Sequence, residues 1–134
     1  MKFNCKEISI SDEEFGCTLT LSENKDDGIS ELEMTTEEIF NSIGRYVMLQ
    51  RTYPEGRFEE DYYYFESSDF DKSGELIDFE INLSRKVFQM TLENEIIEIQ
   101  IDVDDRVYEN LKQIIKKISN GKGKINFTSN EEIN

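Results

Sequence analysis

One stretch of the sequence has the residue types and spacing of a cation site. Asp69, Asp71, Ser73, Gly74 and Glu80 stand at positions 1, 3, 5, 6 and 12 of a calcium loop of the EF-hand type. Such a loop needs a helix on each side to bring its last glutamate back to the ion. The flanking residues instead predict strands, and Asp and Ser side chains also satisfy the amides of an ordinary turn. We prefer the turn and keep, as the alternative, a calcium- or small-ligand-binding β domain that uses the Asp69–Glu80 loop.

Other catalytic chemistry has little support in the residue types. The chain has no His and no Trp, which excludes His-based acid–base catalysis, Ser-His-Asp and Cys-His nucleophiles and His-ligated zinc. Its glycines do not form a phosphate-binding loop ahead of a helix. A suitably spaced carboxylate pair carries no information in a chain with 30 acidic residues. We therefore expect no enzyme activity, no catalytic residues and no cofactor.

The balance of charge indicates the kind of partner. The sequence has 30 acidic and 15 basic residues, which gives a net charge of -15. A field of that sign repels nucleic acid and anionic membranes, and it attracts basic proteins over about 8 Å at physiological salt. We expect a protein partner, no nucleic acid and no membrane. The alternative is that the acidic residues only keep the chain soluble.

The acidic residues are most concentrated in the middle of the sequence. Ten carboxylates stand between Glu55 and Glu80, where the only bases are Arg57 and Lys72. Tyrosines exposed among carboxylates are good anchors for a protein partner, although a solvated loop would have the same composition. The predicted contact region consists of Glu59, Glu60, Asp61, Tyr53, Tyr62, Asp69 and Asp71.

The start of the sequence predicts a β-hairpin. Residues 3–10 and 15–21 alternate apolar with polar positions, and the polar turn Ser11–Glu14 separates them. Phe15 and Cys17 begin the apolar side of the second strand, which predicts that both point inward.

The two cysteines indicate a reducing compartment. In the predicted hairpin Cys5 lies opposite residue 20 and Cys17 opposite residue 8, so the thiols do not face each other. No stretch approaches the ~18 apolar residues of a membrane span, and none has the apolar core of a signal peptide. We expect a cytoplasmic protein with two reduced thiols buried in strands.

The remaining sequence predicts more strands and two helices. From residue 62 onward the pattern predicts an antiparallel meander of four strands, in which residues 76–83 form one unbroken strand. Val107, Leu111, Ile114 and Ile118 give the clearest helix, capped by Asp104 or Asp105 and closed at Gly121. The predicted segments are strands at 3–10, 15–21, 46–51, 62–66, 76–83, 87–92, 96–103 and 124–128, and a short helix near 36–43.

These elements predict an α+β fold. It consists of a predominantly antiparallel β sheet of about seven to eight strands, with one C-terminal amphipathic helix packed on it and the short helix near 36–43. Residues 1–128 are expected to form a single domain, and residues 129–134 a disordered tail. An edge strand at 124–128 could pair with a second copy, so we expect a monomer or a homodimer.

Several short segments follow one another in a known order. After a strand led by Phe3 come Tyr46–Arg51, Asp61–Glu66 and Glu80–Arg85, then a hydrophobic strand, an acidic stretch and the amphipathic helix. This order resembles immunity protein family 10 of bacterial polymorphic toxin systems, across residues 1–118. The segment 23–44 is longer than the corresponding connection in the family.

The resemblance implies a function. It implies a cytoplasmic immunity protein that binds and occludes a cognate toxin domain, and it carries no catalytic residues over to this chain. The net charge of the chain favours a basic toxin, such as a nuclease. Family membership does not identify the toxin, because such immunity proteins are paired individually with their toxins.

Overall fold

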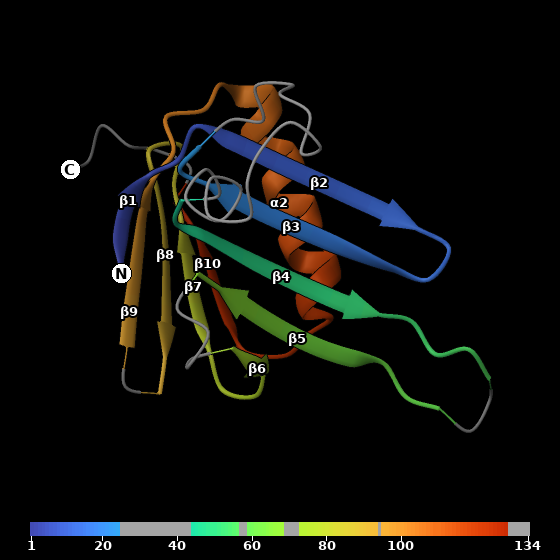
Figure 1. The fold of residues 1–134 in the computed structure, drawn as a ribbon. Coiled ribbons are helices and arrows are strands. Elements are labelled where there is room, and N and C mark those ends of the chain that lie inside the picture. Colours follow the sequence, from blue (N-terminus) through green and yellow to red (C-terminus); the bar gives the residue numbers. More distant parts are fainter. Residues whose placement is uncertain (25–43, 57–58, 69–72, 94, 129–134) are drawn as a thin grey trace, which may run out of the picture.

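The structure is a computed structural model, and it describes residues 1–24, 44–56, 59–68, 73–93 and 95–128 (Figure 1). The short helix predicted near 36–43, the predicted tail 129–134, and Asp69 and Asp71 lie outside the described residues.

Ten strands in the described part of the chain form two five-stranded sheets. Sheet 1 has the strand order β2-β3-β4-β5-β6, and sheet 2 has the order β1-β9-β8-β7-β10. Sheet 1 consists of β2 (Glu7–Glu13), β3 (Gly16–Ser22), β4 (Tyr46–Thr52), β5 (Tyr62–Ser67) and β6 (Gly74–Glu75). Sheet 2 consists of β1 (Lys2–Asn4), β7 (Glu80–Leu83), β8 (Val87–Leu92), β9 (Glu95–Gln100) and β10 (Lys124–Phe127). The predicted α+β class is confirmed.

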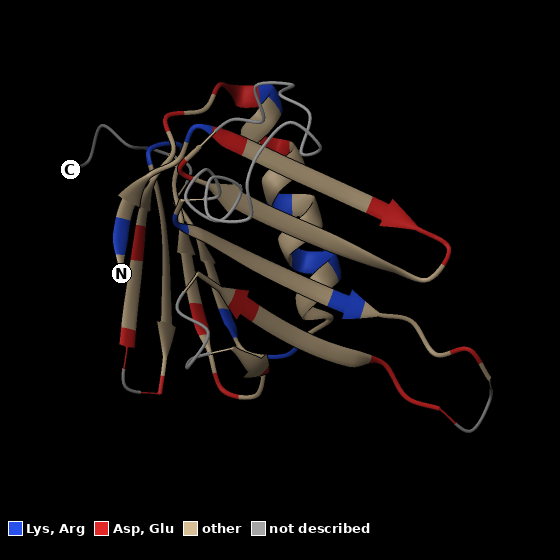
Figure 2. Cartoon of the chain, in the orientation of Figure 1, with Lys and Arg blue, Asp and Glu red and all other residues tan. Residues whose placement is uncertain are grey.

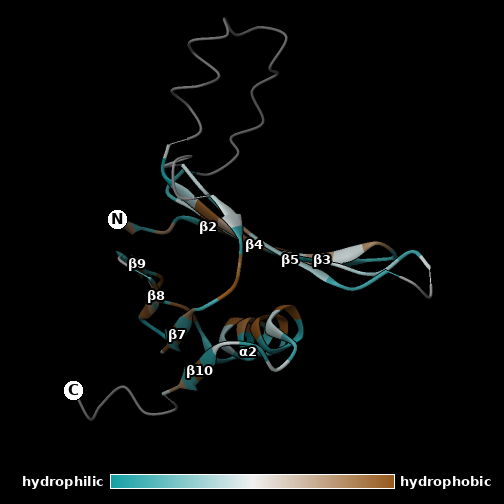
Figure 3. Ribbon diagram, turned by 90° about the horizontal axis from the view of Figure 1, so that it is seen from below, coloured by the Kyte–Doolittle hydropathy of each residue, from teal (hydrophilic) through white to brown (hydrophobic). Residues whose placement is uncertain are grey.

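One helix, α2 (Asp105–Ser119), lies beside sheet 2 and faces sheet 1 (Figure 3). The Tyr108 hydroxyl donates a 2.6 Å hydrogen bond to the carbonyl of Thr128, just after β10, and so joins the helix to the edge of sheet 2. The core therefore lies between sheet 1 on one side and sheet 2 with α2 on the other. Its largest fully buried side chains include Leu19, Leu49, Ile81, Leu83, Phe88, Met90, Ile99, Leu111 and Ile115.

The helix forms where the sequence predicts it. Asp104 is the N-cap, and its side chain accepts a 2.9 Å hydrogen bond from the backbone N–H of Val107. Lys116 and Lys117 lie in the last turn, where positive charge is favourable for the helix dipole, and Asn120 ends the helix in the left-handed conformation. The apolar stripe of α2 is buried against both β3 and β4 of sheet 1.

The predicted strand 76–83 is interrupted, because the chain changes sheets there. β6 pairs with β5 in sheet 1, whereas β7 pairs with β8 in sheet 2. Leu76 and Phe79, in the crossing segment, are buried, while Ile77 is 66% exposed and does not belong to the apolar face. The predicted four-stranded meander from residue 62 is therefore wrong: β5 belongs to sheet 1, and only β7, β8 and β9 form a meander.

The opening of the chain also differs from the predicted hairpin. Residues 2–4 form β1, which runs parallel to β9 in sheet 2, so the hairpin of sheet 1 begins only at Glu7. In it Cys17 lies opposite Asp12, not residue 8. Both thiols are free and Cys17 is buried in β3, but Cys5 is only partly buried and lies between β1 and β2. Cys5 is drawn out of the hairpin because Phe3 packs in the core next to β9.

The predicted last strand is present as β10. It pairs with β7 in a parallel arrangement, and α2 lies over its inward-facing side (Figure 3). Lys116 on α2 lies 5.4 Å from the centre of the Phe127 ring. β10 is an edge of sheet 2, and its pairing with a second copy stays a prediction.

Candidate protein-docking surface

Sheet 1 extends past α2 at the end that carries the β2–β3 turn and the β4–β5 connection (Figure 1). Carboxylates gather at both of these places (Figure 2). Phe15, in the β2–β3 turn, is 64% exposed, although its place in the alternating pattern predicts an inward side chain. The backbone N–H of Tyr53 donates a 2.9 Å hydrogen bond to the carbonyl of Phe15 and holds the turn against the end of β4. We call this surface the acidic end; its members are Glu13, Glu14, Phe15, Glu55, Glu59, Glu60 and Tyr62.

An ion pair fixes the base of the acidic end. The Arg51 Nε lies 2.5 Å from the Asp61 Oδ2, and both side chains are mostly shielded from solvent. The Nη1 of Arg51 also donates a 2.8 Å hydrogen bond to the carbonyl of Lys117, in the last turn of α2. Arg51 therefore ties the sheet to the helix while its charge is balanced by Asp61.

A second polar cluster lies beside the first. The Tyr53 hydroxyl donates a 2.8 Å hydrogen bond to Asp12 Oδ1, and the Lys117 ammonium binds Asp12 Oδ2. The bond from Lys117, together with that from Tyr53, lowers the pKa of Asp12. Burial raises the pKa of the Tyr53 hydroxyl, and its bond to Asp12 raises it further. Tyr53 therefore stays protonated and acts as a donor in this cluster.

These contacts leave the acidic end with an excess of negative charge. Arg51 and Lys117, the bases described at this end of sheet 1, are each occupied by an aspartate. Among the described Lys and Arg side chains, none lies within ion-pair distance of the glutamates of the acidic end. The glutamate side chains, Phe15 and Tyr62 are therefore all exposed at this end. Tyr62 shares the outward face of sheet 1 with Tyr64, while Phe15 is held in the β2–β3 turn by the hydrogen bond from Tyr53.

The predicted contact region is only partly brought together. Glu59, Glu60 and Tyr62 are exposed at the acidic end, whereas Tyr53 and Asp61 are occupied by internal hydrogen bonds. Asp69 and Asp71 lie outside the described residues. The neighbouring Ser68 directly follows β5, at the opposite end of that strand from Tyr62.

Sequence reasoning missed the contribution of the β2–β3 turn. Glu13, Glu14 and Phe15 were assigned to an ordinary turn and to the apolar side of a strand. The available signal was the two consecutive glutamates before Phe15, because a hairpin turn of charged residues is a place where an aromatic side chain becomes exposed.

The outward face of sheet 1 continues the surface. Its positions carry hydroxyl, amide and phenol groups, and in the described strands they include no Lys or Arg. Glu66 accepts hydrogen bonds from the Tyr46 hydroxyl at 2.7 Å and from the Tyr64 hydroxyl at 3.2 Å. The Tyr62 and Tyr64 rings stack with their centres 6.4 Å apart. Such a face resembles antibody binding surfaces in composition, where tyrosine gives contact area at low conformational cost.

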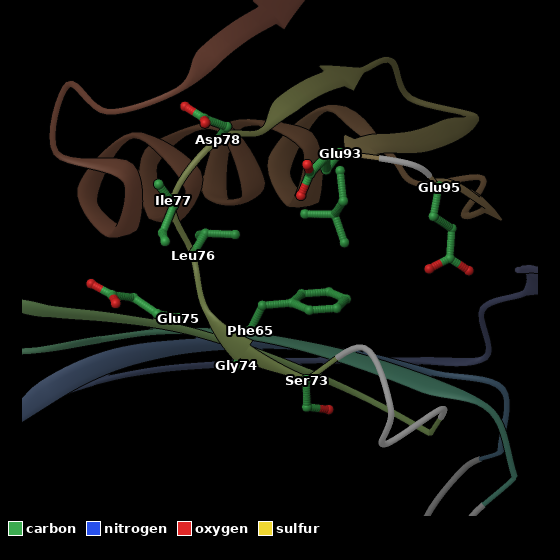
Figure 4. Close-up of a pocket in the computed structure, with 10 residues that line it drawn as sticks. Phe65, Ser73, Gly74, Glu75, Leu76, Ile77, Asp78, Glu93 and Glu95 are labelled. Carbon is green, nitrogen blue, oxygen red and sulfur yellow. The ribbon is translucent and has the colours of Figure 1, made fainter.

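The opposite end of the two sheets holds a cavity of about 550 Å³ (Figure 4). Its apolar wall is formed by Phe65, Leu76 and Leu92, and Asp78 and Glu93 stand at its rim. Glu95, which also lines it, lies 3.6 Å from the N-terminal ammonium group of Met1. The cavity is open, because it lies where the chain crosses between the sheets.

The described residues of the alternative calcium loop, Ser73, Gly74 and Glu80, do not converge. Ser73 Oγ accepts a 3.2 Å hydrogen bond from the backbone N–H of Ser67, as in a polar turn. Glu80 lies in β7 of the other sheet, where its carboxylate is 3.7 Å from the Lys124 ammonium. Strands flank the segment, and the described residues contain no group of three or more carboxylates or cysteines that could hold a metal ion.

The cysteines show no activation as nucleophiles. Cys17 has no exposed surface, and burial raises the pKa of the Cys5 thiol, whose sulfur donates to the carbonyl of Glu7 at 3.1 Å. A raised pKa favours the thiol over the reactive thiolate. Both cysteines are therefore packing residues in this structure.

No family model matches the chain, and neither a curated protein nor a solved structure matches it. The described part of the chain contains no helix with the length and apolar character needed to span a membrane. The case for a function therefore depends on the fold and on the chemistry of the surfaces described above.

Proposed function

We propose that this chain is an immunity protein that binds a cognate toxin domain and occludes it, without making or breaking a bond. The toxin is a basic protein, such as a nuclease, and the complex forms in the cytoplasm. The observation that carries the proposal is the acidic end, where exposed aromatic rings stand among glutamates that have no described basic partner. The order of segments that resembles immunity protein family 10 supports the same function.

The physical basis is complementary charge around an aromatic anchor. A channel that binds the phosphates of a nucleic acid is positive, so a surface of carboxylates is drawn to it at a rate that falls with salt. Phe15 and Tyr62 then supply aromatic contact area, and aromatic anchors carry much of the binding energy of an interface. Tyr62 is paired with Thr52, and the Tyr53 N–H holds the carbonyl of Phe15, so little further ordering is needed on binding.

Co-expression tests the function directly. The C-terminal domain of the protein encoded immediately beside this chain is induced in bacteria with and without the chain. We expect growth arrest by the domain alone, rescue by the chain, and co-purification of the two as a stable complex. A toxic domain that the chain neither binds nor neutralises would contradict the proposal.

Charge substitutions then test the surface. In Glu59→Gln with Glu60→Gln, the association rate with the toxin domain should fall and its dependence on salt should flatten. The matched control is Asp78→Asn with Glu93→Gln, which removes the same charge from exposed positions at the opposite end. Equal effects of the two pairs would show that only the net charge matters and that the acidic end is not the docking site.

A truncation tests the anchor. Phe15→Ala should speed dissociation of the complex by about tenfold or more, because central aromatic contacts dominate interfaces. Ile77→Ala, which shortens a side chain of similar exposure far from the acidic end, is the control and should leave dissociation unchanged.

A further inference from the structure

The strand β2 is a long and regular sheet edge. In the described part of the chain it has a neighbour on one side only, β3, and it pairs with that strand residue by residue from Glu7 to Glu13 without a bulge. Natural edge strands are commonly blocked by proline, by charged side chains such as lysine, by a bulge or by being very short. β2 has seven residues and no proline, lysine or bulge, and its charges are all negative: Glu7, Asp12 and Glu13. Figure 1 shows it as the outermost strand of sheet 1.

A groove runs along this edge on the inner side of the sheet. It has a volume of about 460 Å³ and lies between β2 and the start of α2. Ile10 points into it and remains 40% exposed, because the helix does not cover this part of the sheet. Its apolar lining consists of Cys5, Ile8, Ile10, Ile101, Val103 and Val107. A strand added beside β2 would place alternate side chains in this groove.

The charges along β2 indicate what kind of strand fits. Pairing of β2 with a second copy about Ile10 places Glu7 of each chain opposite Glu13 of the other, and like charges directly opposite are destabilising. Asp102 and Asp104 add negative charge to the lining of the groove, where Lys6 is the one base among the described residues. A segment with Lys or Arg at its outward positions and apolar residues at its inward positions complements both the charge and the groove.

We propose that β2 accepts an extended basic segment of a protein partner as an additional strand of sheet 1. Main-chain hydrogen bonds to the edge give the affinity, and the groove selects apolar side chains at alternate positions. The inference rests on the proposed function in one respect only, which is that the partner is a basic protein. The acidic end adjoins β2 through the β2–β3 turn, so one partner can contact both.

A synthetic peptide tests the edge without the toxin. The isotopically labelled full chain is titrated with the acetylated and amidated peptide Lys-Val-Lys-Val-Lys-Val-Lys, and amide shifts are followed by NMR. Two derivatives carry N-methyl groups on alternate residues, one on the odd and the other on the even positions. We expect the shifts to concentrate on residues 7–13. One derivative should lose binding and the other should keep it, because only one set of amides faces the protein in an added strand.

A substitution and its control complete the test. Ile10→Lys should weaken binding of the peptide by about tenfold or more through lost apolar contact and charge repulsion. Ile96→Lys makes the same change at an exposed position of β9, an interior strand of sheet 2, and should have no effect. Shifts centred elsewhere, or equal binding of the two N-methylated peptides, overturn the proposal.

The same samples also test whether a second copy of the chain, instead of a basic segment, occupies the β2 edge. Concentration-dependent dimerisation that Ile10→Lys abolishes would assign the edge to a second copy and overturn the proposal of a basic segment. Failure of the peptide experiment leaves toxin neutralisation standing. Failure of neutralisation with successful strand addition leaves the edge standing, so the two outcomes are distinguishable.

Discussion

The outward faces of the two sheets differ in how their acidic side chains are balanced. On sheet 2, basic and acidic side chains form ion pairs across neighbouring strands. Lys2 Nζ lies 3.2 Å from Glu98 Oε2, and Lys124 Nζ lies 3.7 Å from Glu80 Oε1. On the outward positions described in sheet 1 there is no base, and Glu66 is satisfied by tyrosine hydroxyls instead. The strands and their alternation are alike in both sheets. The placement of a few lysines therefore decides which face is electrostatically complete and which is left for a partner.

The largest effect should come from the core that the two faces share. Leu83→Ala in β7 should lower the free energy of unfolding by about 2 to 5 kcal/mol, because a fully buried side chain leaves a cavity. Urea unfolding with hydrogen exchange should show both sheets losing protection together. Ile77→Ala, at an exposed position, should change stability by about 0.5 kcal/mol or less. If the two sheets unfolded separately, each would be an independent folding unit, and their faces could not be compared as parts of one fold.

The next effect concerns the ion pair beneath the acidic end. Asp61→Asn should lower the free energy of unfolding by about 1 to 3 kcal/mol, because Arg51 keeps its position near the helix end but loses its counter-charge. Glu60→Gln removes the same charge from an exposed neighbour and should cost much less. Chemical denaturation of both variants makes the measurement. Equal stability of the two would show that the Arg51–Asp61 ion pair contributes little to the stability of the fold.

Alkaline titration sharpens the contrast between the faces. Burial, followed by the hydrogen bond to Glu66, raises the pKa of Tyr46 to about 12 from an ordinary value of 10.0, and the same two causes raise that of Tyr64. Because the folded-state pKa is the higher one, this stabilisation is complete below pH 10 and is lost as pH rises toward 12. Phenolate absorbance should therefore develop late. In Glu66→Gln it should develop at lower pH, and an unchanged titration would remove the role of Glu66.

The smallest effect is expected on the surface of sheet 2. Lys2→Gln with Lys124→Gln leaves Glu98 and Glu80 without bases and so imitates the charge of sheet 1. Exposed ion pairs contribute about 0 to 1 kcal/mol each, so thermal unfolding should shift little. If the double variant proved strongly destabilised, charge pairing on sheet 2 would be a condition of folding and not a surface property.

The sequence predicts those elements whose signal is local. The period of apolar residues and the Asp104 cap identify α2, and alternation identifies β4 and β8 with nearly their observed bounds. The predicted edge strand at 124–128 is confirmed as β10, although its parallel pairing with β7 depends on a distant segment.

The errors arise where a decision depends on distant neighbours. Alternation continues without a break from residue 76 to 83, yet the chain leaves sheet 1 after Glu75 and joins sheet 2 at Glu80. Periodicity states which residues share a side but not which sheet they join. Phe15 shows the same limit, since an apolar residue in register with a strand is exposed when nothing packs over the end of that strand. The acidic end could therefore be predicted from the sequence only in its 59–62 portion.

The lengths of the edge strands determine how large an assembly can grow. A filament requires two complementary edges on every subunit, so that each addition creates the site for the next. The other edge strands described are short: β10 has four residues, β1 three and β6 two. Of the described strands, β2 is thus the one long edge left open. A chain that pairs with β2 finds no second long edge, in the described part of the same subunit, at which the next chain could add. Edge-to-edge contact therefore ends in a closed complex and not in a fibre.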